Sequence, residues 1–179
     1  MMRCVLISIK PKWCKLIIAG RKTLELRKSN IEPPFKCYIY CTKDNTDFAP
    51  KRIWWKADKT GFQHIMNGKV IGEFVCDYRL RHCEMANADI AEQMSCVSRE
   101  DILKYSNGKE VFGWHISDLV IYDQPKPLNM FYKECVGLNN TGMCYECENA
   151  VGEECDCAVN GQLHLTRPPQ SWCYVEECK

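Results

Sequence analysis

The chain has 179 residues, of which 46% are hydrophobic and 26% charged, so wholesale disorder is excluded and one globular domain with a small appendage is expected. Its 24 basic and 23 acidic side chains give a formal net charge of +1, which excludes a uniformly basic nucleic-acid-binding surface but allows a local basic patch. Every apolar stretch is far shorter than the roughly 20 residues that span a bilayer, and Lys10 and Lys12 interrupt the N-terminal one, so we expect a cytoplasmic protein with no signal peptide and no membrane insertion.

Strands are predicted at 5–9, 22–27, 36–41, 69–78, 114–122 and 172–176. A helix is predicted at 11–19, because the N–H that Pro11 lacks would have no helical partner at the first position and because Gly20 can adopt the left-handed conformation that ends a helix. Ser98 begins a second short helix through a capping box, and that helix ends at Asn107. Six strands with two short helices predict an α+β domain that is mostly β.

Strands this short leave many unpaired edges, and a closed or nearly closed small barrel would remove them. Along the strand at 69–78, alternation predicts that four residues share one face: Val70, Gly72, Phe74 and Cys76. We expect a single domain over 1–179, with a Cys-rich insertion at 135–157 as its one appendage. Pro125 is expected to end the strand at 114–122.

The octapeptide Gly20-Arg21-Lys22-Thr23-Leu24-Glu25-Leu26-Arg27 combines charge with strand alternation. Thr23, Glu25 and Arg27 share one face of a strand, and the leucines share the other. One interpretation is a surface ion pair with a solvated lysine, which would stabilise little. The other is a polar pocket in which Lys22 and Arg27 contact phosphate or a base edge and Glu25 orients the arginine.

These eight residues fit the G-x-K-x-x-E-x-R motif of the ASCH domain, a member of the PUA-like β-barrel superfamily. Residues 8–13 resemble the strand-to-helix entry of this family. Residues 113–119 and 165–172 are similar to a phage and clostridial subgroup. The resemblance covers 5–176 and implies a barrel with a cleft near the first helix. It also implies a nucleic-acid or nucleotide binding module, with single-stranded or modified RNA in the cleft.

Carried over by position, Lys22, Glu25 and Arg27 are the expected ligand-binding residues of that cleft. Gln170, Ser171 and Trp172 follow a Pro-Pro pair at the start of the last strand, and we expect them at the mouth of the cleft. Stacking of a base on an aromatic ring is worth roughly 1–3 kcal/mol, which would matter for a single-stranded ligand. By contrast, Trp13 is expected in the core, because it lies on the apolar face of its helix.

Two other functions stay open. Some small ASCH proteins look like amidohydrolases of acetylated cytidine that use a motif lysine and a threonine nucleophile. Here Lys22 matches the lysine, Glu25 stands where the threonine would be, and Thr23 is the substitute nucleophile, so these three would be catalytic if the protein is an enzyme. The third possibility is a phage-encoded protein that binds a host factor through an added element.

Five cysteines lie within 23 residues and offer thiolates for a metal: Cys135, Cys144, Cys147, Cys155 and Cys157. The Cys-x2-Cys pair has zinc-knuckle spacing, and a short polar segment buries too little apolar area to fold without a metal. We therefore expect a structural zinc bound by four of the five, with a disulfide pair or an iron–sulfur cluster as the alternatives. The other nine cysteines are expected to be mostly small buried hydrophobic residues.

Overall fold

The computed structural model describes residues 2–43, 66–133 and 164–178, and the structural statements below concern these residues. Their elements, in chain order, are β1 (Arg3–Ile9), α1 (Pro11–Ile18), β2 (Leu24–Arg27), β3 (Phe35–Cys41), β4 (Lys69–Cys76), β5 (Arg79–Leu80), α2 (Ala88–Ser95), α3 (Arg99–Ser106), β6 (Phe112–His115), β7 (Ser117–Lys126), the 3-10 helix η1 (Leu128–Met130) and β8 (Trp172–Val175). The α+β class, mostly strands with three short α-helices, agrees with the prediction. None of the helices in these ranges is long and apolar enough to cross a membrane.

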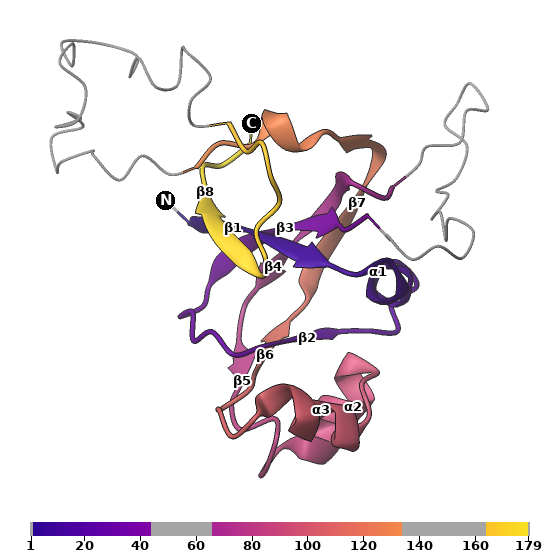
Figure 1. Cartoon of the computed structure of the whole chain (residues 1–179), viewed down its shortest axis with the longest axis vertical. Coiled ribbons are helices and arrows are strands. Elements are labelled where there is room, and N and C mark those ends of the chain that lie inside the picture. The colour runs from indigo at the N-terminus through magenta and orange to yellow at the C-terminus, as the bar shows by residue number, and fades with distance from the viewer. Residues whose placement is uncertain (1, 44–65, 134–163, 179) are drawn as a thin grey trace, which may run out of the picture.

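The strands form two hydrogen-bonded sheets (Figure 1). The larger has the order β7-β4-β3-β1-β8, and within it β1 runs parallel to β3 while the other neighbours are antiparallel. The smaller has the antiparallel order β2-β6-β5. A closed or nearly closed small barrel was expected, and the strands of the described ranges form two sheets that both contribute to one core.

The division occurs within residues 114–122, which the sequence predicted as one strand. Trp114 pairs with β2 in the small sheet, but Ser117 pairs with β4 in the large one, and Asp118 has a left-handed φ of 47° at the change of direction. The single-strand prediction is wrong because apolar alternation continues across this bend. Pro125 does not end β7 either, since β7 is an edge strand on which a missing N–H costs no ladder hydrogen bond.

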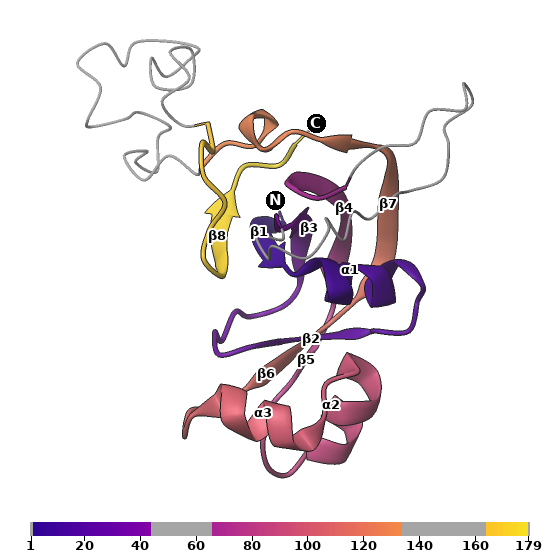
Figure 2. The ribbon, with the colours of Figure 1, turned by 45° about the vertical axis from the view of Figure 1, so that its right-hand side comes forward.

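Figure 2 shows the layers of the fold, with α2 and α3 on one side of the small sheet. Three apolar clusters hold these layers together. The main cluster includes residues of both sheets and of α1, and Trp114 is its largest fully buried side chain. A second cluster covers the opposite face of the large sheet around Tyr38 and Phe131. The third joins Leu24 and Leu26 of β2 to the α2–α3 pair, which lies beyond the small sheet. Strand β2 is therefore packed on both faces.

A bulge in β4 alters the expected facing of its residues. Val70 belongs to the outer cluster and Phe74 to the main core, although period-two alternation predicts one face for both. The register of β4 against β7 shifts between Val70 and Gly72, and Ile71 takes the inward position instead. Beyond a bulge, each residue of the strand lies on the opposite face from the one that alternation predicts. The pattern of apolar residues in this strand does not signal the bulge.

Both predicted helices are confirmed and a third was missed. Gly20 follows α1 with φ 67°, and its N–H donates to the Ile17 carbonyl at 2.9 Å. The Ser98 hydroxyl accepts from the Asp101 N–H at 3.2 Å and so caps α3. Helix α2 was not predicted because it ends at Cys96, which adopts a left-handed φ of 58° although it is not a glycine, so the usual sequence signal for a helix end is absent.

The nine described cysteines are free thiols. The buried ones confirm the expectation of small hydrophobic residues: Cys4, Cys14, Cys37, Cys41, Cys76 and Cys83. Cys96, Cys173 and Cys178 are half-buried. The five cysteines of the predicted zinc site lie outside the described residues.

Candidate functional site

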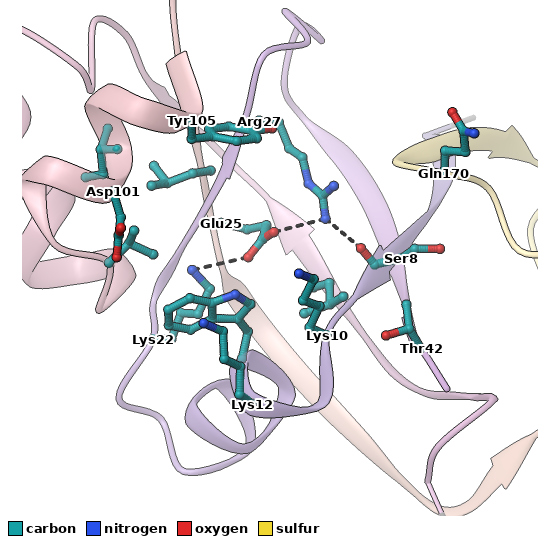
Figure 3. Close-up of a pocket in the computed structure, with 15 residues that line it drawn as sticks. Ser8, Lys10, Lys12, Lys22, Glu25, Arg27, Thr42, Asp101, Tyr105 and Gln170 are labelled. Carbon is teal, nitrogen blue, oxygen red and sulfur yellow. Dashed lines mark hydrogen bonds and ion pairs between the residues drawn. The ribbon is translucent and has the colours of Figure 1, made fainter. Parts of the chain in front are cut away.

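A cavity of about 500 Å³ opens where the end of β1 and the start of α1 approach β2 and α3 (Figure 3). Its size suits a ligand of small-molecule dimensions. The lining residues come from four elements, β1, α1, β2 and α3, and from five segments outside them: Ser8, Ile9, Lys10, Lys12, Trp13, Lys22, Glu25, Leu26, Arg27, Thr42, Val97, Asp101, Ile102, Tyr105 and Gln170. Three of the four charged residues of the octapeptide, Lys22, Glu25 and Arg27, are thus wall residues of one pocket.

Lys22, Glu25 and Arg27 form a buried ionic cluster on one side of this pocket. Their exposed fractions are 2%, 6% and 8% respectively. Glu25 Oε1 lies 3.0 Å from Arg27 Nη2, and Glu25 Oε2 lies 3.2 Å from Lys22 Nζ. The interpretation of a solvated surface pair is therefore wrong, since these charges are desolvated and neutralise one another.

Strand alternation produces this cluster as the sequence predicted. Leu24 and Leu26 extend to the α2–α3 side of β2 and enter the third apolar cluster. Glu25 and Arg27 consequently extend to the other side, toward β1 and α1. Gly113 on the neighbouring strand lets β2 approach, because a Cβ there would lie 2.4 Å from Leu24 Cδ2.

The Arg27 guanidinium is held by three acceptors. Its Nη2 donates to the Ser8 carbonyl at 2.8 Å and faces Glu25, and its Nη1 donates to Ser171 Oγ at 3.1 Å. Its Nε is buried and has no hydrogen-bond partner among the described residues. A buried donor without an acceptor is costly, and Arg27 lines a cavity from which a ligand could supply the acceptor. Arg79 Nε, outside the pocket, is likewise buried without a partner among the described residues.

The Lys22 ammonium is held mainly by backbone carbonyls. Its Nζ donates to the Leu24 carbonyl at 2.9 Å and to the Ser95 carbonyl at 3.0 Å, which uses two of its three N–H donors. Glu25 Oε2 lies 3.2 Å from this nitrogen as an ion-pair partner but has no hydrogen-bond partner among the described residues. Lys22 therefore links the segment before β2 to the end of α2 and adds a positive charge to the pocket wall.

Two aromatic rings lie at the pocket from different helices. Trp13 of α1 is partly buried against the main core and also lines the cavity, so the prediction of a core residue describes only part of its position. Lys12 Nζ lies 4.2 Å from the centre of its ring. Tyr105 of α3 is 40% exposed, and burial of the rest of the ring raises the pKa of its hydroxyl, which stays neutral.

The other predicted site residues take different positions. Gln170 lines the cavity, and Ser171 contacts it only through its hydrogen bond to Arg27. The Trp172 indole donates to Ser29 Oγ at 2.7 Å and packs against the main core, and it does not line the cavity. Thr23 does not line it either, so the described structure does not bring the candidate nucleophile to the pocket.

Sequence reasoning missed several wall residues. Lys10 and Lys12 were considered as interruptions of an apolar run and as part of the stretch 8–13 that resembles the family, but not as pocket residues. Asp101 and Tyr105 stand four residues apart, which places both on one face of α3, and that spacing was a usable signal. The packing of α3 against β2 could not be predicted from the sequence.

No group of three or more potential metal ligands occurs within the described ranges. The predicted zinc site lies outside those ranges and stays a prediction. No protein-family model matches the chain, and no curated protein matches it.

Solved structures do match. The chain is similar to the crystal structure of ASCH from Zymomonas mobilis, with a TM-score of 0.57 and 15% sequence identity over 97% of this chain and 88% of that chain. This chain has the ASCH fold. Two single-residue mutants of the same Zymomonas protein match at 15% identity with TM-scores of 0.52 and 0.50, covering 97% of this chain and 91% and 89% of theirs. At this identity the similarity concerns the ASCH fold, and the residues of the site must be argued from this chain alone.

Proposed function

We propose that the protein binds nucleic acid or a nucleotide, with single-stranded or modified RNA as the ligand, in the pocket beside Lys22, Glu25 and Arg27. The observation that carries this proposal is the Arg27 guanidinium. It is fixed in direction by Ser8, Glu25 and Ser171, yet its buried Nε lacks an acceptor. A planar guanidinium held in this way suits a phosphate oxygen or the acceptor edge of a base.

The dimensions and walls of the pocket support a single-stranded ligand. A volume of about 500 Å³ suits roughly one nucleotide unit and is too small for a duplex. Trp13 and Tyr105 offer ring faces on which a base can stack. The net charge of only +1 also favours recognition in a pocket over attraction to a broad basic face.

The same geometry favours binding over amide hydrolysis. A hydroxyl nucleophile needs a base within hydrogen-bonding reach and a position beside the substrate. Thr23 is not a wall residue, and the Lys22 ammonium is held by two backbone carbonyls and lies beside Glu25. The cluster on β2 is suited to holding Arg27 in place.

A fluorescence anisotropy titration with labelled single-stranded RNA at low and moderate salt tests the proposal. The variant Arg27→Met removes the guanidinium group. We expect RNA affinity to fall at least tenfold, which corresponds to the loss of about one charge-assisted hydrogen bond. Arg79→Met is the matched control, because Arg79 is also largely buried and bonded to a backbone carbonyl but lies outside the pocket.

Thermal melting establishes that each variant is folded. If Arg27→Met does not fold, Arg27→Lys keeps the positive charge without the planar guanidinium and gives the same test. RNA affinity that is equal in wild type, Arg27→Met and Arg79→Met would overturn the proposal, as would the absence of saturable binding to wild type.

A further inference from the structure

Lys10 and Lys12 carry positive charge at the pocket that nothing in the described residues neutralises. Both side chains are exposed and line the cavity. Neither ammonium forms an ion pair in the described part of the chain, and the one contact of Lys12 is with the Trp13 ring. In Figure 3 the Lys10 ammonium points toward the region where Glu25 and Arg27 meet.

The position of these lysines is electrostatically unfavourable without an anion. Lys10 is the N-cap of α1 and Lys12 lies in its first turn, where the helix presents the positive end of its dipole. The first turn contains no acidic residue, and no side chain caps it. Cations placed there repel the helix end, whereas a bound anion would be attracted by both.

A second, independent observation points to an anion in the same cavity. Arg27 is more than nine-tenths buried, and its Nε–H has no acceptor among the described residues. The pocket wall holds four cations, Lys10, Lys12, Lys22 and Arg27, but only two carboxylates, Glu25 and Asp101. The surplus is two positive charges: the ionic cluster has two cations for one carboxylate, and Lys10 and Lys12 outnumber the remaining carboxylate, Asp101, by one.

We propose that the pocket receives a terminal phosphate monoester of a nucleotide, held between Lys10, Lys12 and the free edge of Arg27. This inference rests on the proposed function and specifies its ligand. A phosphate monoester carries a charge of about −1.5 to −2 at pH 7, which matches the surplus. An internal phosphodiester carries only one negative charge and would leave one lysine uncompensated.

Two sources supply this chemistry, a free mononucleotide and the phosphorylated end of an RNA strand. The probes are therefore a nucleoside, its 5′-monophosphate, and one short single strand with and without a 5′-phosphate, each titrated against wild type. We expect the phosphate to raise affinity about tenfold or more in both pairs if strand ends bind, and in the nucleoside pair alone if the ligand is a mononucleotide.

The variant Lys10→Gln/Lys12→Gln should abolish the phosphate-dependent increase. Both side chains are exposed, so the variant should melt like wild type. Lys15→Gln is the matched control, because Lys15 is an exposed lysine on the same helix and does not line the pocket. We expect it to retain the increase.

Failure of this inference is distinguishable from failure of the proposed function. A terminal phosphate that raises affinity in neither pair, or an increase that Lys15→Gln reduces as much as the double variant does, overturns the inference and leaves RNA binding in place. Absence of binding by every probe overturns both.

Discussion

Glu25 links Lys22 and Arg27 by presenting one carboxylate oxygen to each, at 3.2 Å and 3.0 Å. The three side chains would each be expensive to bury alone, and together they are tolerated because every charge faces an opposite one. The carboxylate is therefore the member whose loss leaves two desolvated cations side by side. It fixes the direction of the guanidinium and so determines what Arg27 can bind.

Replacing the Glu25 carboxylate should mainly lower the stability of the fold. We expect Glu25→Gln to lower the free energy of unfolding by about 3–5 kcal/mol, the range for breaking a buried ion pair. Urea denaturation followed by circular dichroism measures the change. Glu100→Gln, which removes an exposed partner of Lys104 on α3, should cause little change. A similarly small effect of both variants would mean that the cluster is far less desolvated than its burial indicates.

Ser171→Ala tests whether the direction of Arg27 matters for binding. The change removes the acceptor of Arg27 Nη1, so unfolding stability should fall by about 1 kcal/mol and RNA affinity by severalfold. Ser117→Ala removes a hydroxyl that donates to the Val75 carbonyl outside the pocket, and it should cost similar stability with no loss of affinity. Equal affinities for the two variants would contradict a positioning role for Ser171.

Buried thiols predict a loss of stability at alkaline pH. Burial raises the pKa of Cys76 and of Cys83 from 9.0 to about 12, and it raises the pKa of Cys37 well above 9.0. Because the folded pKa exceeds the unfolded one, the stabilisation is complete below about pH 9 and is lost as the pH rises toward 12. The urea midpoint should hold to about pH 9 and then fall, less steeply in Cys76→Ala/Cys83→Ala. An identical slope in that variant would show that other groups cause the fall.

The cysteine-rich segment predicts a metal that elemental analysis can detect. Protein purified under reducing conditions should contain about one zinc per chain, and Cys144→Ser/Cys147→Ser should remove it. Cys173→Ser/Cys178→Ser changes two half-buried thiols elsewhere and should retain it. A metal-to-protein ratio near zero in fully reduced wild type would exclude the zinc site.

The charged half of the pocket could be predicted and the helical half could not. Glu25 and Arg27 alternate on one strand and Lys22 lies two residues before it, so one short segment supplies all three. Asp101 and Tyr105 reach the same cavity only because α3 packs on β2, which depends on contacts between segments far apart in the sequence. The change of sheet near Ile116 and the bulge after Val70 were missed for a related reason. Both depend on which partner strand is nearby, and the local pattern of apolar residues is compatible with straight strands.

The packing of α2 and α3 has a consequence for how the ligand preference of this fold can change. These helices leave the small sheet after β5 and return to it at β6, and their apolar anchor on β2 is Leu24 and Leu26. They contribute Asp101 and Tyr105 to the pocket but no member of the ionic cluster. The helical wall of the pocket and its ionic cluster are thus supplied by separable parts of the chain. Exchange of residues 81–111 alone would remodel that wall, and Arg27 would keep its partners Ser8, Glu25 and Ser171.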